Sequence, residues 1–271
     1  MMHALRLESA KWFKTMQVAA SNHLAYKLNF LLLVIGPTLV FFFVKFNLWH
    51  AIFSLSGKGV VQGYDLKGML RYQGLVLVVS LLAQGYNSMN LAEDIRMGRI
   101  SSYLIYPFQF WQFHLASFLG FQVIQIVLAS LTLLVLGLSG LILPLTPSAL
   151  ASGILLSALV GAFWFATSFV IGLISFWLEE TWVLRVMLLT ISQFLSGAIL
   201  PLELYPEWMV RLLAWTPFPY MTYAPVKIMA GEYGGSIGTA ALTLFVWLLI
   251  VGALGSALWR RGLKLYTAAG M

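Results

Sequence analysis

The sequence contains no cysteine. This absence excludes disulfide frameworks, thiolate metal sites and thiol nucleophiles together. Charged residues are also scarce, at 9% of the chain, whereas soluble domains contain roughly 25%. Hydrophobic residues make up 61%, which is more than a soluble core could bury. The composition therefore predicts an integral membrane protein.

A nucleotide-binding phosphate loop is missing as well. The sequence has no G-x-x-x-x-G-K-[ST] stretch, and Gly57-Lys58-Gly59 is followed by Val60 instead of a hydroxyl residue. The chain is therefore not expected to bind ATP through a phosphate loop. If ATP drives its activity, another polypeptide must supply the energy.

Catalytic and metal-binding patterns are weak. Gly234-Gly235-Ser236-Ile237-Gly238 matches G-x-S-x-G, but that nucleophile elbow needs a preceding strand, and no strand pattern is present. The four histidines have neither triad nor metal-ligand spacing: His3, His23, His50 and His114. We therefore predict no catalytic residue and no metal site.

The charges that are present lie near predicted helix ends or in loops. All nine acidic residues do so, which argues against a proton-driven carrier with a carboxylate at the bilayer midplane. The formal charge is +7, but the basic residues form no stripe. Membrane orientation explains this charge better than nucleic-acid binding does.

The hydrophobic pattern predicts one all-α membrane domain over residues 1–271, with six crossings. Residues 1–26 mix basic and apolar side chains and are expected to form an interfacial helix. The crossings are expected at 28–44, 75–91, 113–143, 150–178, 183–200 and 237–259.

Basic residues predict the orientation of these crossings. Six crossings place both termini on one side, and ten basic residues fall there against six on the other. The ten are Arg6, Lys11, Lys14, Lys27, Arg96, Arg99, Arg185, Arg260, Arg261 and Lys264, and the six are Lys45, Lys58, Lys67, Arg71, Arg211 and Lys227. The positive-inside tendency then makes the termini cytoplasmic.

Two segments outside the crossings carry functional interest. Residues 93–107 alternate acidic and basic side chains, which predicts a short water-facing helix that a soluble partner could grip. Residues 201–225 are apolar but rich in proline, and proline divides a chain into short pieces. This second segment is either a lid over a translocation route or a packed loop, and it includes Pro201, Pro206, Trp208 and Pro217.

Polar and small residues recur on single faces of the crossings. The polar sets are Gln84, Asn87 and Asn90, Gln122 and Gln125, and Ser192, Gln193 and Ser196. They either line a conduit or form interhelical hydrogen bonds. The small residues predict close helix packing, with Gly153, Ser157 and Gly161 in the fourth crossing and Gly252 and Ser256 in the sixth.

The order of these elements resembles the membrane subunits of ABC-2 type exporters. The resemblance is carried by an N-terminal interfacial helix and by a charged segment that ends in Leu104-Ile105-Tyr106-Pro107. Ser196-Gly197-Ala198-Ile199-Leu200-Pro201 and Pro206-Glu207-Trp208 follow the fifth crossing. The resemblance covers essentially the whole chain.

The resemblance implies a bacterial inner-membrane permease that works with a separate ABC ATPase, which binds the ATP and Mg²⁺. Residues 93–107 would be the coupling helix, with polar contacts from Glu93, Asp94, Arg96 and Arg99, close approach at Gly98 and a turn at Pro107. The second and fifth crossings would line the route, which makes Gln84, Asn87, Asn90, Gln193 and Ser196 candidates. A second permease, identical or homologous, would complete the pathway. The alternative is a membrane anchor that holds a soluble complex without transport.

Overall fold

The computed structural model describes residues 2–25, 36–57, 59–61, 63–83, 91–105, 108–141 and 145–266. These residues form helices joined by turns, and no strand occurs among them. The prediction of an all-α fold is confirmed.

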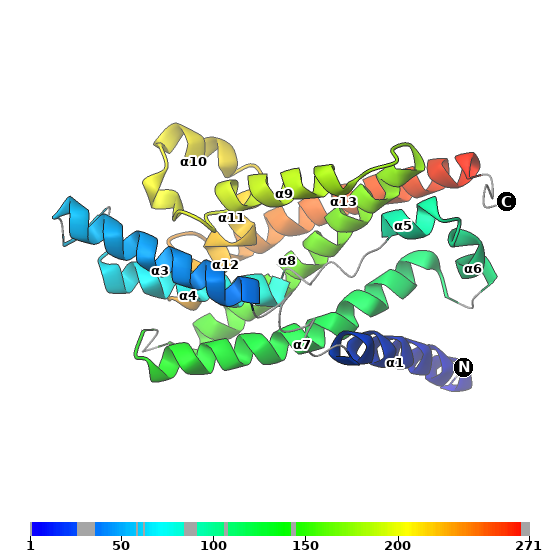
Figure 1. The fold of residues 1–271 in the computed structure, drawn as a ribbon, viewed down its shortest axis with the longest axis horizontal. Coiled ribbons are helices and arrows are strands. Elements are labelled where there is room, and N and C mark those ends of the chain that lie inside the picture. The colour runs from blue at the N-terminus through cyan, green and yellow to red at the C-terminus, as the bar shows by residue number, and fades with distance from the viewer. Residues whose placement is uncertain are drawn as a thin grey trace.

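Among the described residues, six apolar helices run roughly along the long axis of the molecule (Figure 1). Their bounds are α3 Gly36–Ser56, α4 Leu66–Ala83, α7 Phe110–Leu138, α8 Pro147–Leu173, α9 Trp182–Leu195 and α13 Ile237–Leu265, and η2 (Ile174–Phe176) extends α8. Four of these, α4, α7, α8 with η2, and α13, are long and apolar enough to span a membrane. The shorter apolar stretches of α3 and α9 cover Leu39–Leu55 and Trp182–Leu195.

The first two predicted crossings are misplaced along the chain. The helix expected at 28–44 is α3, which runs to Ser56, and the helix expected at 75–91 is α4, which begins at Leu66. The expected bounds leave Lys45 and Arg71 outside the crossings, but both lie inside helices, Lys45 in α3 and Arg71 in α4. They are accommodated there because the Lys45 ammonium donates to the Ala198 carbonyl and Arg71 pairs with Glu232.

The N-terminal helix α1 (Met2–Ala25) packs against the first half of α7. A Cβ at Gly120 of α7 would lie 2.4 Å from the Met16 carbonyl oxygen, so glycine is required for this approach. At the same contact, the rings of Trp12 and Phe108 are 5.3 Å apart.

Small residues allow α8 to approach its neighbours, as predicted for the fourth crossing. A Cβ at Gly153 would clash with the Met229 side chain, and one at Gly161 would lie 3.5 Å from the Ala83 carbonyl oxygen. The corresponding prediction for the sixth crossing is wrong within this chain, because a Cβ at Gly252 would meet nothing within 4 Å.

The proline-rich segment consists of short helices at the end opposite the termini (Figure 1). Its elements are η3 Leu202–Leu204, α10 Glu207–Leu213, α11 Phe218–Met221 and α12 Tyr223–Met229. Pro201, Pro206 and Pro217 each stand immediately before one of these helices, where a missing backbone donor costs least. The Trp208 side chain of α10 is exposed.

Candidate functional site

The charged segment forms two short helices instead of the single helix expected over residues 93–107. Helix α5 covers Leu91–Arg96 and α6 covers Ile100–Ile105. Gly98 separates them in the left-handed conformation, with φ of +71°. A glycine at this position ends a helix without steric cost, and the Arg99 amide closes the turn on the Asp94 carbonyl. Pro107, expected to set the following turn, lies outside the described residues.

One face of this α5–α6 element is anchored on the spanning helices. Leu91, Ile95 and Ile100 are buried in a cluster with Leu173 of α8 and Phe110 of α7. The Leu91 side chain lies directly against Gly172, where an added Cβ would clash with it. A movement of α5–α6 must therefore move the ends of α7 and α8 with it, because close-packed contacts transmit displacement.

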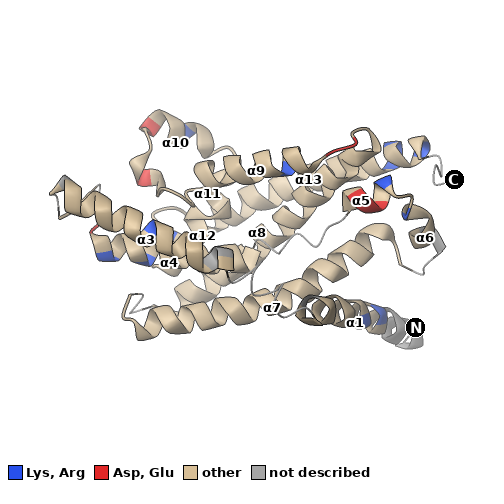
Figure 2. Ribbon diagram, in the orientation of Figure 1, with Lys and Arg blue, Asp and Glu red and all other residues tan. Residues whose placement is uncertain are grey.

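The opposite face carries exposed charges (Figure 2). Arg99 pairs with both Glu93 and Asp94, with nitrogen–oxygen distances of 3.1 Å to each. Arg96 pairs with Glu180 of the α8–α9 connection at 2.9 Å. Exposed pairs of this kind contribute about 0–1 kcal/mol to stability. They orient the guanidinium groups at the surface more than they hold the fold together.

Asp94 differs from the other acids because its carboxylate is buried. It accepts hydrogen bonds from the Tyr103 hydroxyl at 3.0 Å and from Arg99 at 3.1 Å, and the His114 Nε2 lies 3.9 Å away. Burial raises the pKa of Asp94, and the hydrogen bonds from Tyr103 and Arg99 oppose that shift. The arrangement makes Asp94 the inner attachment point of the charged face.

A tyrosine at the end of the last helix also holds this element. The Tyr266 hydroxyl donates to the Gly98 carbonyl at 2.6 Å and lies 3.3 Å from the Ser101 hydroxyl. Its ring packs against Phe176 at a centroid distance of 6.4 Å. No local pattern in the sequence predicts this contact, because Tyr266 bonds to a backbone carbonyl 168 residues away.

Residues 196–199, which follow α9, form a break in the helical backbone. Side chains from other elements donate hydrogen bonds to the carbonyls of this break. The Tyr72 hydroxyl donates to the Gly197 carbonyl at 2.7 Å, and the Gln73 amide donates to the Ile199 carbonyl at 3.0 Å. The Lys45 ammonium donates to the Ala198 carbonyl at 2.8 Å. Buried backbone carbonyls need such partners, so the side chains of α3 and α4 hold this segment in its conformation.

The candidate pathway residues are distributed unevenly. Ser196 is buried in the break, where its hydroxyl donates to the Thr222 hydroxyl at 3.1 Å, and Gln193 is half-buried one turn earlier. Gln84, Asn87 and Asn90 lie outside the described residues. In α7, the Gln122 amide donates to the Leu81 carbonyl at 3.2 Å and to the Leu82 carbonyl, so this side chain joins α7 to α4.

The family comparison identifies the chain. A family described as ABC-2 family transporter protein matches residues 38–270. The chain belongs to the ABC-2 transporter family. A search of curated proteins finds no match. Together with the apolar helices, the family makes this chain a multi-pass membrane protein of an ABC transporter.

At the end opposite α5–α6, the ABC-2 protein has an ion cluster that sequence reasoning missed. Lys227 of α12 is buried and pairs with Glu203 at 3.0 Å and Glu232 at 3.3 Å. Arg71 of α4 also pairs with Glu232, and the Tyr223 hydroxyl donates to Glu203 at 2.9 Å. The sequence contains one indication of this cluster, a single lysine inside the apolar run 224–230. A charge in such a run needs a partner, so Lys227 predicts an acidic residue beside it.

Proposed function

We propose that this ABC-2 protein is the permease subunit of an ATP-driven exporter, forming half of a translocation pathway. In this proposal, a separate ABC ATPase, which binds ATP and Mg²⁺, docks on the exposed face of α5–α6. The observation that carries the proposal is the construction of that element. It presents Glu93, Arg96 and Arg99 on one face while its other face is fixed to the ends of α7 and α8.

The mechanism follows from how the element is braced. An ATPase that closes would push α5–α6 as a unit, because Asp94 and Tyr103 hold its two short helices together. The Arg96–Glu180 ion pair would transmit this displacement to the α8–α9 connection. The hydrogen bond between Gly98 and Tyr266 would transmit it to α13. A rigid-body push would then become a tilt of several helices at once.

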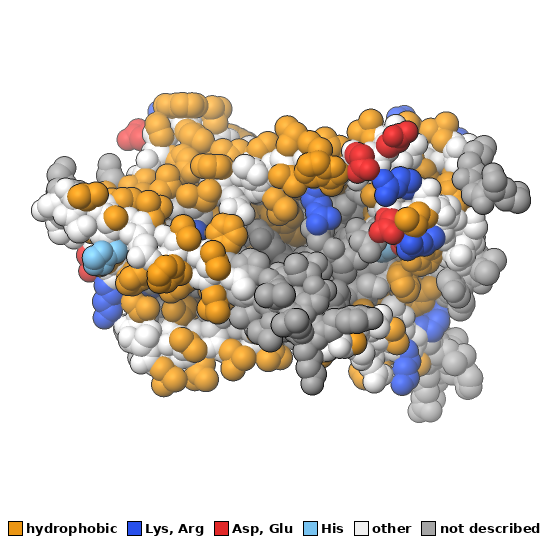
Figure 3. Space-filling view, in the orientation of Figure 1, with side chains coloured by type: hydrophobic (Ala, Val, Ile, Leu, Met, Phe, Trp, Pro, Cys, Tyr) orange, Lys and Arg blue, Asp and Glu red, His pale blue; other side chains and the backbone are white. Residues whose placement is uncertain are grey.

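The remaining parts of the proposed exporter are a second subunit and an outer gate. The exposed apolar side chains of α3 and α9, including Phe43, Met187 and Phe194, offer a surface for a second permease, identical or homologous (Figure 3). The segment 201–225 would cover the outer mouth of the pathway. The protein would reside in a bacterial inner membrane, with six crossings and both termini in the cytoplasm.

The proposal is tested by recovering the protein from its native cells in mild detergent, with and without the substitution Arg96→Glu. Arg96 is half-exposed on the docking face, and reversing its charge places a carboxylate opposite Glu180. A Walker-motif ATPase is expected to co-purify with the unmodified chain, and its recovery is expected to fall with Arg96→Glu.

Arg211→Glu is the matched control, because Arg211 is an exposed arginine of α10 at the other end of the molecule. Recovery of the unmodified chain without any ATPase would contradict the proposal. Equal loss of the ATPase with both substitutions would do so as well. ATP hydrolysis that rises with transported cargo separates an exporter from a passive membrane anchor.

A further inference from the structure

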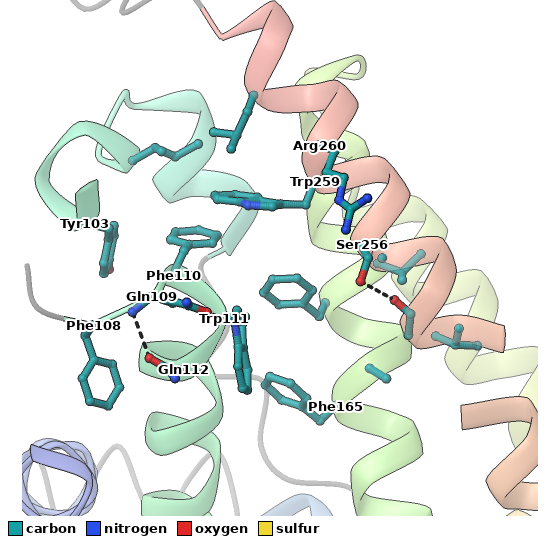
Figure 4. Close-up of a pocket in the computed structure, with 18 of the residues that line it drawn as sticks. Tyr103, Phe108, Gln109, Phe110, Trp111, Gln112, Phe165, Ser256, Trp259 and Arg260 are labelled. Carbon is teal, nitrogen blue, oxygen red and sulfur yellow. Dashed lines mark hydrogen bonds between the residues drawn. The ribbon is translucent and has the colours of Figure 1, made fainter. Parts of the chain in front are cut away.

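A cavity of about 990 Å³ lies between α7, α8 and α13, next to the α5–α6 element (Figure 4). Its volume is at the upper end of the range of ligand pockets, roughly 300–1,000 Å³. Neither the proposed coupling nor the proposed pathway uses it.

Aromatic side chains line much of the cavity. Phe110 and Trp259 stack with their centroids 4.9 Å apart, and Figure 4 shows Trp111 of α7 and Phe165 of α8 opposite the α13 residues Ser256 and Arg260. The α13 wall is open at Gly252 and Ser256, where the side chains are small. A Cβ at Gly252 would meet nothing within 4 Å, so none of the described residues fills the space beside it.

The charge of the lining has one sign. Lys11 and Arg260 line the cavity, and none of its described lining residues is acidic. Arg260 is exposed and has no ion-pair partner among the residues that the structure describes. Along α13, Gly252 lies about 12 Å from Arg260 at a rise of about 1.5 Å per residue. The cavity is therefore cationic near the helix end and apolar deeper in the bundle.

We propose that this cavity binds one anionic phospholipid from the leaflet at the α5–α6 end. The phosphate lies at Arg260, Lys11 adds positive charge beside Phe108 on the opposite wall, and an acyl chain extends past Ser256 and Gly252 between the aromatic walls. Basic pockets between spanning helices bind anionic lipid headgroups in this way. The proposal requires that the chain lies in a bilayer, and it does not require ATPase coupling.

The position of the cavity gives the lipid a role. Ile100 and Tyr103 of α6 belong to its lining, as does Trp259 of α13. A bound lipid would fill the space behind the α5–α6 element and support it from the membrane side.

Native mass spectrometry of the purified full chain tests this. The chain is stripped of lipid and then titrated with phosphatidylglycerol or phosphatidylcholine carrying the same acyl chains. One phosphatidylglycerol is expected to be retained in preference to phosphatidylcholine. Arg260→Gln is expected to lower phosphatidylglycerol retention by about fivefold, the ordinary contribution of one basic side chain, and to change phosphatidylcholine retention less, because that headgroup carries no net charge.

Arg261→Gln is the matched control, because Arg261 is the adjacent exposed arginine and does not line the cavity. Gly252→Leu is a second variant, in which the new side chain enters the open space and is expected to lower retention of both lipids. The thermal unfolding midpoint of each variant is measured beside the unmodified chain to verify folding.

Three results would overturn the lipid assignment. The first is equal retention of the two lipids by the unmodified chain, and the second is an equal effect of Arg260→Gln and Arg261→Gln. The third is displacement of phosphatidylglycerol by excess inorganic phosphate, which would identify a simple anion site.

Discussion

Single residues decide how the α5–α6 element is held. Gly98 adopts a positive φ, and its carbonyl accepts a hydrogen bond from the Tyr266 hydroxyl. The residues 93–99 were recognisable in the sequence as a charged segment, but their individual roles were not. Asp94 faces inward, whereas Arg96 and Arg99 remain at the surface.

The hydroxyl of Tyr266 can be tested by Tyr266→Phe, which keeps the ring against Phe176 and removes the hydrogen bond to Gly98. We expect the free energy of unfolding to fall by about 1 kcal/mol, the usual net value of one hydrogen bond. We also expect cargo-stimulated ATP hydrolysis of the assembled transporter to fall, because the hydrogen bond that joins the end of α13 to Gly98 is lost.

Tyr205→Phe is the control, since the Tyr205 hydroxyl also donates to a backbone carbonyl, that of Phe194, at the other end. It should cost similar stability and leave the coupling intact. Unchanged coupling in Tyr266→Phe, measured beside this control, would remove Tyr266 from the mechanism.

At the scale of elements, the ion cluster around Lys227 fixes the proline-rich segment to the bundle. Lys227 of α12 joins Glu203 of η3 to Glu232, and Arg71 of α4 completes the connection to a spanning helix. The prolines could be read from the sequence as breaks, but the charges that hold the pieces together come from four separate positions. If this segment opens during transport, the cluster has to separate.

Lys227→Met is expected to lower the free energy of unfolding by about 1–3 kcal/mol, between the values for exposed and buried ion pairs. Lys227 is buried, but Glu203 and Glu232 are about one-third exposed, so water screens part of the loss. Chemical denaturation in detergent measures the change. Arg211→Gln, at the same end, should change the free energy of unfolding by no more than about 0.5 kcal/mol. An equal loss in Arg211→Gln and Lys227→Met would show that the ion cluster does not stabilise the fold more than an exposed arginine does.

For the whole molecule, the central question is which end faces the cytoplasm. The α5–α6 element, the end of α13 and the described basic residues of α1 gather at one end, and the proline-rich segment lies at the other (Figure 2). The excess of basic residues at the first end favours its cytoplasmic placement.

Cysteine labelling tests this orientation without background, because the chain has no cysteine of its own. Met97→Cys and Trp208→Cys introduce thiols at exposed positions of opposite ends. A membrane-impermeant thiol reagent should label Trp208→Cys in intact cells and Met97→Cys only after permeabilisation. The reverse pattern would invert the topology and remove the proposed contact with a cytoplasmic ATPase.

The sequence by itself determined the membrane class, the all-α fold and the position of the charged segment. These follow from composition and local order, which are properties of neighbouring residues. Only the tertiary structure decided that Lys45 and Arg71 lie inside helices, that Asp94 turns inward, that Tyr266 holds Gly98, and that Gly252 borders a cavity. Each of these depends on a partner, or on the lack of one, far away in the chain, and no local pattern specifies which distant group arrives at a given side chain.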